Sequence, residues 1–376
     1  MVVNFDAQDF AFRELNMLEK KQKIESIQIL RALAFFEIFL GHCGIGIFTG
    51  SFGVSVFVIL SGFCMALNYV PKAEKLSLSL ISNVKFALSK IKKMYWVHIV
   101  MLAAIYVIVK MPTSENAIRR IWINVFLVQG FTPHSEDYFS YNGVAWYLST
   151  YLFICIFAPY IIKLISKCKN KKLMLIFAFI IYVVMIAVGY YLDKNPIAIG
   201  DDFARWFTYI FPGYRLLDFT MGAMLGWHYL NSEHKQNAGI AVGTMLECIT
   251  AAVCAATVVI FHKMDGVWNG LCHTALFVPA SLLSTFVFSE CRGFITKLLN
   301  HPFFLWVGNL SAYTFLIHQV VIRWLRFEIK DCFGKVRYRI ILTILSFVIT
   351  MFLAQLAKYT ADRRKRRLQI DNYNLA

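Results

Sequence analysis

Long apolar runs separated by short polar stretches dominate the pattern of this 376-residue chain. A helix needs about 20 apolar residues to cross a bilayer, and ten stretches meet that need. They are 26–48, 52–70, 95–111, 145–165, 172–192, 207–230, 239–261, 270–288, 303–322 and 338–358. The pattern therefore predicts an all-α polytopic membrane protein with about ten transmembrane helices.

One further apolar stretch, 115–131, is short and polar ("ENAIRRIWINVFLVQGF"). Counting it as a span would reverse every later segment and place the lysine-rich stretch 163–172 outside the cell. We therefore predict a re-entrant or interfacial helix at 115–131.

The chain divides into a cytoplasmic segment over 1–25, a transmembrane domain over 26–358 and a basic cytoplasmic tail over 359–376. The first 23 residues mix acidic and basic side chains without the apolar core of a cleavable signal. We therefore expect the first apolar stretch to be retained as a span. The pattern contains no internal repeat and no second domain.

The distribution of Lys and Arg predicts the orientation. The chain is 59% hydrophobic and 16% charged, with a net charge of +16. Basic residues gather before the first span, in 71–94, in 163–172 and in the tail, whereas 131–144 holds two acids and no Lys or Arg. Because cytoplasmic loops are enriched in Lys and Arg, we predict cytoplasmic termini and a bacterial plasma membrane. The same rule accounts for the basic charge without nucleic-acid binding.

The stretch 323–339 departs from this rule, because it is basic and yet should lie outside. Two interpretations remain open for it: an interfacial stretch, or a surface for an anionic acceptor.

Cysteine usage gives no sign of a metal site. Most of the nine cysteines lie inside apolar stretches, where Cys behaves as a small hydrophobic residue. No CxxC or Cys/His spacing typical of metal binding occurs. We therefore expect no metal cofactor.

Three ionisable residues, Arg31, Glu37 and His42, lie inside the first span, where a charge costs roughly 2.5 kcal/mol or more. Arg31 and His42 are eleven residues apart, which places them about 20° apart on one helix face and ~16 Å apart along the axis. The competing interpretations are a snorkelling arginine and a histidine in a helix–helix hydrogen bond. Glu37 lies on another face, where we expect a structural partner or a protonated carboxyl.

Four stretches in order resemble the integral-membrane acyltransferase 3 family, and together they cover roughly residues 26 to 358. One motif, R-x10-H, is carried by Arg31 and His42 and is followed by "GVSVFVILSGF". The others are "AWYLSTYLFICIFAPYI" (145–161), "FPGYRLLDFTMGAMLG" (211–226) and "VGNLSAYTFLIH" (307–318). One position departs from the family, because Tyr151 stands where many members have Glu.

The resemblance implies transfer of an acyl group, commonly acetyl, from acyl-CoA to a hydroxyl or amine of a glycan, lipid or small molecule, as in O-acetylation of cell-envelope polysaccharide. A base is needed for the acceptor hydroxyl, and His is the commonest choice, so His42 is predicted to be catalytic together with Arg31. Phosphates of CoA need cations, and we assign Arg31, Lys90, Lys92 and Lys93 to them. The competing interpretation of these lysines is ordinary positive-inside charge.

Other polar and aromatic residues of these motifs are candidates for substrate binding. Each has a structural alternative: an interfacial histidine, a buried ion pair or aromatic residues of the membrane interface. The candidates are His318, Ser311, Arg215, Asp218, Tyr313, Trp146 and Asn142.

Direct transfer is preferred over a covalent route. Cys43 points about 100° away from His42, and no G-x-S-x-G motif is present. Two other classes compete with the enzyme: a transporter or flippase of a glycan or lipid, and a structural partner in an envelope assembly. The chain lacks the repeated halves with broken helices that are typical of transporters.

Overall fold

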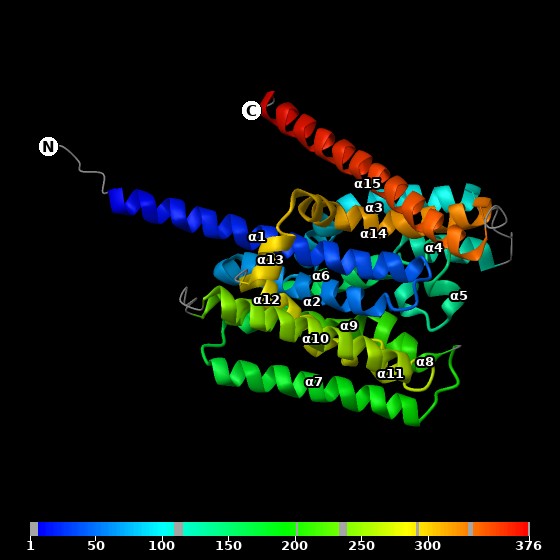
Figure 1. Cartoon of the computed structure of the whole chain (residues 1–376), viewed down its shortest axis with the longest axis horizontal. Coiled ribbons are helices and arrows are strands. Elements are labelled where there is room, and N and C mark those ends of the chain that lie inside the picture. Colours follow the sequence, from blue (N-terminus) through cyan, green and yellow to red (C-terminus); the bar gives the residue numbers. More distant parts are fainter. Residues whose placement is uncertain are drawn as a thin grey trace.

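The computed structural model describes residues 7–108, 116–200, 202–232, 239–290, 293–329 and 334–374, with side chains from Glu25 to Arg364. Helices form nearly all of these residues, and no strand occurs among them (Figure 1). The longer helices are α1 (Ala7–His42), α2 (Ser51–Tyr69), α3 (Leu80–Ile108), α6 (Trp146–Ser166), α7 (Lys171–Lys194), α9 (Pro212–Leu230), α10 (Ile240–Met264), α12 (Val278–Glu290), α14 (Pro302–Ile329) and α15 (Lys335–Asn374). The shorter ones are η1 (Val70–Lys75), α4 (Asn116–Val125), η2 (Gln129–Phe131), α5 (Ser135–Tyr138), α8 (Phe203–Arg205), the π-helical η3 (Trp206–Ile210), α11 (Asn269–Cys272), η4 (Ala275–Phe277) and α13 (Phe294–Leu299).

The predicted fold class is confirmed, because the described chain is helical and each of the ten predicted spans overlaps with one of the longer helices, although 270–288 overlaps with α12 only from Val278 onward. Seven helical stretches in the described chain are long and apolar enough to cross a membrane, and they contain α2, α3, α6, α7, α10, α14 and α15. The remaining three, α1, α9 and α12, fall below this measure of length or hydropathy. The count of ten spans stays a prediction, and residues 109–111 of the third lie outside the described residues.

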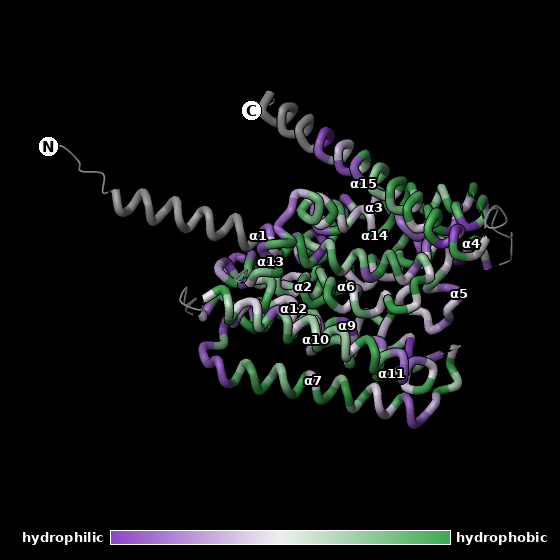
Figure 2. The backbone as a smooth tube through the Cα atoms, in the orientation of Figure 1, coloured by the Kyte–Doolittle hydropathy of each residue, from purple (hydrophilic) through white to green (hydrophobic). Residues whose placement is uncertain are grey.

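Helices at the centre of the bundle are buried, and those at its edges are not. In their most apolar stretches, 72% of α14 and 61% of α2 is buried, against 17% of α7. α7 and α15 lie on opposite sides of the bundle (Figure 1). The tube of α7 is hydrophobic along its length and hydrophilic at both ends (Figure 2). An apolar helix that its own protein leaves uncovered is suited to face lipid.

The stretch predicted to be interfacial forms α4, a helix of 10 residues. At 1.5 Å per residue it is about 15 Å long, roughly half the thickness of the hydrocarbon core. Arg119 of α4 donates to Asp137 of α5 at 2.7 Å, and Arg120 pairs with Glu136. The two acids of the loop 131–144 therefore anchor α4 at the end of the bundle where α6 begins.

Close backbone contacts hold the central helices together. A Cβ added at Gly222 of α9 would lie 2.0 Å from the carbonyl oxygen of Ile59 of α2, and one at Gly308 of α14 would lie 2.0 Å from that of Gln28 of α1. Both distances are too short for any side chain, so glycine is what lets these helix pairs approach. The second contact fixes α14 against α1, the two helices that carry the motif residues.

Candidate active site

The two histidines of the family motifs meet where α1 lies along α14. His318 Nε2 lies 3.4 Å from His42 Nδ1, and the His318 side chain is fully buried. Three turns earlier along α1, Arg31 Nε donates to Ser311 Oγ at 3.0 Å. His318 is therefore enclosed by the protein, and four predicted site residues form two pairs along one helix interface.

The hydrogen bonds of the two histidines define which ring nitrogen carries hydrogen. His42 Nδ1 lies 2.9 Å from the carbonyl oxygen of Ile38, and His318 Nδ1 lies 3.1 Å from that of Thr314. A carbonyl oxygen only accepts, so both neutral rings carry hydrogen on Nδ1. The Nδ1–H of His42 is then shared between the Ile38 carbonyl oxygen and, more weakly, the lone pair of His318 Nε2, and His42 Nε2 keeps a lone pair available as a base.

Arg31 opens into a cavity of about 410 Å³ between α1, α2, α3, α6 and α14. Lys72 and Lys90 also line it, and both ammonium groups lie over the ring of Tyr69, at 5.0 and 4.6 Å from its centroid. Tyr151 lies deeper in the same cavity, with its ring stacked on that of Tyr147. The cavity thus combines three cations with an apolar and aromatic interior, and Tyr151 occupies the place where many family members have Glu.

The three lysines predicted to bind CoA do not lie together. Lys90 lines the cavity of Arg31, whereas Lys92 and Lys93 line a separate space of about 530 Å³ between α3 and α15. Lys93 also pairs with Asp362 of α15 at 3.6 Å. Lys92 lies 200° around the helix from Lys90, so one helical run cannot direct all three cations to one ligand.

His42 opens into a second cavity of about 110 Å³ at the end of α1. Trp146, Arg205 and Gln319 line it, together with Ser51 of α2. Ser51 Oγ lies 3.2 Å from His273 Nδ1. This cavity has several polar groups around the catalytic candidate, and its lining contains no Asp or Glu.

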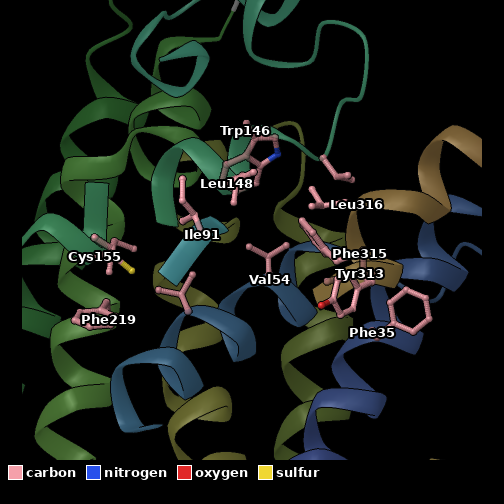
Figure 3. Close-up of a cluster of buried hydrophobic side chains, with 14 of the residues drawn as sticks. Phe35, Val54, Ile91, Trp146, Leu148, Cys155, Phe219, Tyr313, Phe315 and Leu316 are labelled. Atoms are coloured by element: carbon pink, nitrogen blue, oxygen red, sulfur yellow. The ribbon is translucent and has the colours of Figure 1, made fainter. Parts of the chain in front are cut away.

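The aromatic ring of Phe315 lies between the two cavities and lines both of them. Its centroid is 5.1 Å from that of Tyr147 and 6.0 Å from that of His318. Figure 3 shows Phe315 of α14 near Val54 and Phe35, in the buried apolar cluster that surrounds the site. Phe315 is therefore the side chain that the linings of the Arg31 cavity and the His42 cavity have in common.

Glu37 has a structural partner, as the sequence predicts. Its Oε1 accepts hydrogen bonds from Thr49 N, Thr49 Oγ1 and Gly50 N at 2.8 to 2.9 Å, and its Oε2 accepts one from Gly53 N at 2.8 Å. These donors stand at the start of α2, where helix N–H groups lack partners of their own. Glu37 therefore fixes the start of α2 against α1, beside the His42 cavity.

The remaining predicted substrate residues lie within the bundle. Arg215 Nη2 and Asp218 Oδ2 form a fully buried ion pair at 3.0 Å, and Arg215 also donates to Thr274. Asn142 Nδ2 donates to the carbonyl oxygen of Leu316 at 2.7 Å, and Tyr313 packs in the apolar cluster. Of this group only Trp146 lines either site cavity, so substrate binding by the others stays a prediction.

The unexplained basic stretch 323–339 begins inside α14 rather than in a loop. Arg323 donates to the carbonyl oxygen of Tyr141, and Arg326 donates to that of His42. Lys330 lies outside the described residues. The first two cations of this stretch therefore lie beside the His42 cavity.

Sequence reasoning missed two residues of that cavity, Arg205 and Gln319. The signal that could have found Arg205 is its position. The predicted orientation places the segment before α9 outside the cell, where an arginine departs from the positive-inside rule. Asp202 caps α8 by accepting a hydrogen bond from Arg205 N at 3.0 Å. The π-helical turn η3 follows and brings Tyr209 to the same cavity.

The fold also brings together three groups that the sequence spacing did not suggest. The ligand atoms of Asp265, Cys272 and His273 lie within 4.8 Å of one another, close enough to hold one metal ion. His273 Nε2 lies 3.3 Å from Asp265 Oδ1, and this hydrogen bond lowers the pKa of the Asp265 carboxyl. His273 and Asp265 therefore have partners in each other without an ion.

A bundle of apolar helices with internal polar cavities defines an integral membrane protein. The family described as an acyltransferase domain, acyltransferase 3, matches residues 24–357. The chain belongs to this family and is a membrane acyltransferase. No curated protein and no solved structure matches it.

Proposed function

We propose that this protein transfers an acyl group, in the first instance acetyl, from acyl-CoA to a hydroxyl of an envelope glycan or lipid. The observation that carries the proposal is the pair of cavities on either side of Phe315, one holding Arg31 and the other His42. A reaction between a phosphorylated donor and a hydroxyl acceptor needs cations on one side and a base on the other.

The donor occupies the larger cavity in this proposal. Arg31, Lys72 and Lys90 supply the positive charge that the phosphates of CoA require. The pantetheine arm then runs past Phe315 and brings the thioester to His42, a distance along α1 of about 16 Å. Ser311 holds the Arg31 guanidinium by its Nε, which leaves the terminal nitrogens of Arg31 free for phosphate.

His42 acts as the general base in this mechanism. Its Nε2 takes the proton of the acceptor hydroxyl while the oxygen attacks the thioester carbonyl, and a tetrahedral intermediate forms. The carbon–sulfur bond then breaks, and the proton passes from His42 to the departing CoA sulfur. The carbonyl oxygen of Ile38 accepts from His42 Nδ1–H at 2.9 Å, with His318 Nε2 at 3.4 Å as a weaker second acceptor, so the imidazolium keeps a hydrogen-bond partner.

The proposed location is a bacterial plasma membrane with both termini in the cytoplasm. Support comes from the positive-inside distribution of Lys and Arg. In this orientation the Arg31 cavity is nearer the cytoplasm, where acyl-CoA is present, and the His42 cavity is nearer the outside.

The test uses purified protein in lipid nanodiscs with radiolabelled acetyl-CoA and a cell-envelope extract. We expect free CoA to be released and label to enter the extract. His42→Gln keeps a hydrogen-bonding side chain but cannot act as a base at neutral pH, so turnover should fall roughly 10²-fold or more while acetyl-CoA still binds. His318→Ala should lower turnover less than His42→Gln does, because it removes a partner of the base rather than the base itself.

His42→Gln at nearly the wild-type rate would show that another group is the base. The same assay separates the competing classes. A transporter or flippase would leave acetyl-CoA intact, and so would a structural partner of an envelope assembly.

A further inference from the structure

Arg205 presents an unsatisfied donor to the cavity of His42. Its Nε is buried and has no hydrogen-bond partner, although the residue lines the cavity. The guanidinium carbon lies 5.9 Å from the ring centroid of Phe139, which also lines the cavity. A buried donor without a partner is destabilising, so its persistence beside a base points to a ligand.

The acids nearest to Arg205 have other partners. Asp202 accepts hydrogen bonds from the backbone N–H of Arg205 and from Asn269 Nδ2, at 3.0 and 2.7 Å. Asp265 pairs with His273 at 3.3 Å. No carboxylate in the described parts of the chain forms an ion pair with the Arg205 guanidinium.

Two further arginines lie at the rim of the same cavity. Gly143 lines the cavity, and a Cβ added there would lie 3.4 Å from Arg323 Nη2 and 2.9 Å from Gln319 Oε1. Arg326 binds the backbone carbonyl of His42 itself. Both arginines thus contact only carbonyl oxygens here, which satisfy donors without neutralising charge.

Gln319 adds an acceptor to these donors. Its Oε1 is buried without a hydrogen-bond partner, and the residue lines the cavity next to His318 in the sequence. The unsatisfied groups are therefore one cationic donor and one neutral acceptor. This combination suits a ligand that carries an anionic group and a hydroxyl.

We propose that the acceptor is anionic, and that Arg205 binds its carboxylate or phosphate while Gln319 and His42 hold the hydroxyl to be acylated. The inference rests on the proposed acyl transfer and names the acceptor class of the same site. Arginine binds both anions through two parallel N–H donors. The chemistry is shared by an acidic sugar and by a phosphate of a lipid-linked glycan.

The first experiment reads the charge of the product. Nanodisc-embedded protein is incubated with labelled acetyl-CoA and a cell-envelope extract, and labelled products are applied to an anion exchanger at pH 7. We expect them to be retained. Partition into butanol then identifies a lipid phosphate as the source of charge, and partition into water identifies an acidic glycan.

The second experiment tests Arg205 in the same assay. Arg205→Gln should raise the apparent KM for the extract roughly tenfold to a hundredfold and leave the KM for acetyl-CoA unchanged. Arg205→Lys keeps the charge but lacks the fork of parallel N–H donors. Its apparent KM for the extract should therefore fall between those of the wild type and Arg205→Gln. Arg363→Gln is the matched control, since this exposed arginine of α15 lies outside 323–339 and lines neither site cavity.

Two results would overturn the anionic acceptor: a labelled product that passes the exchanger unretained, or an unchanged KM for the extract in Arg205→Gln. If no label leaves acetyl-CoA at all, acyl transfer itself fails. That outcome is distinct, because it affects the wild-type protein before any variant is compared.

Discussion

At the scale of single residues, Arg31 connects the proposed donor cavity to α1, the helix that carries the proposed base His42. Arg31→Lys keeps the positive charge but loses the Nε that donates to Ser311, and with it the planar fork. We expect the apparent KM for acyl-CoA to rise roughly tenfold or more, because hydrogen bonds to charged groups contribute about 1.5–3 kcal/mol. Steady-state kinetics with varied acetyl-CoA measures the change.

Lys171→Gln is the control for this variant, since Lys171 is an exposed cation at the start of α7. It should bind acyl-CoA like the wild type. If Arg31→Lys fails only because it no longer accumulates in the membrane, Arg31 is structural and the assignment of the donor cavity is wrong.

The residues of the two pairs at this site could be predicted from the sequence better than the residues that line the cavities around them. Arg31 and His42 could be placed on one face by helical spacing alone, and the structure brings both to the α14 interface. Helical spacing separates Lys92 from Lys90, but which of the two lines the Arg31 cavity depends on the phase of α3 relative to its neighbours, which the sequence does not give. Arg205 was missed because its place depends on a short capped turn and a π-helical segment, which no periodicity predicts.

At the scale of helices, the approach of α14 to α1 decides whether both residue pairs form. Gly308→Ala would place a methyl group 2.0 Å from the backbone carbonyl of Gln28, so the two helices must separate. We expect a loss of about 1–3 kcal/mol in stability, seen as a lower Tm, together with reduced turnover.

Gly46→Ala provides the comparison, since a Cβ there meets nothing within 4 Å. It should change neither the Tm nor the rate. A wild-type Tm and rate in Gly308→Ala would mean that α1 and α14 tolerate separation. The Arg31–Ser311 and His42–His318 contacts would then not depend on this close approach.

Helix existence was predictable along this chain, whereas helix length and partners were not. Apolar runs of about 20 residues locate the spans because lipid leaves the backbone no other hydrogen-bond partner. Nothing in that constraint says that α2 would pack against α9 or that α7 would stay at the edge. Those choices depend on small residues such as Gly222, which allow one helix pair to approach more closely than another.

At the scale of the whole molecule, the predicted orientation can be tested at the two ends of α6. Leu76 and Leu78 accept hydrogen bonds from Lys163 and Tyr160, near the last turns of α6, whereas α5 lies before its first turn. Cysteines introduced at 80 and 136 should therefore lie at opposite ends. We expect an impermeant thiol reagent added to intact cells to label 136 and spare 80.

The labelling needs a background without reactive native thiols, so Cys168 and Cys248 are replaced by Ser, together with Cys291 and Cys332, which lie outside the described residues. Permeabilised cells supply the positive control for position 80. Labelling of 80 in intact cells, with 136 protected, would reverse the orientation and place the Arg31 cavity away from cytoplasmic acyl-CoA.

Phe315 lines two cavities that differ in part of their walls, with η1 and α3 at the Arg31 cavity and α8 and η3 at the His42 cavity, and this has a consequence for the order of events in turnover. If each substrate has its own entrance, neither blocks the other, and no product needs to leave before the second substrate arrives. Initial rates measured over a grid of both substrate concentrations should then give reciprocal plots whose lines intersect. Parallel lines would instead indicate a ping-pong reaction through an acylated protein, and would mean that the two substrates take turns at a single entrance.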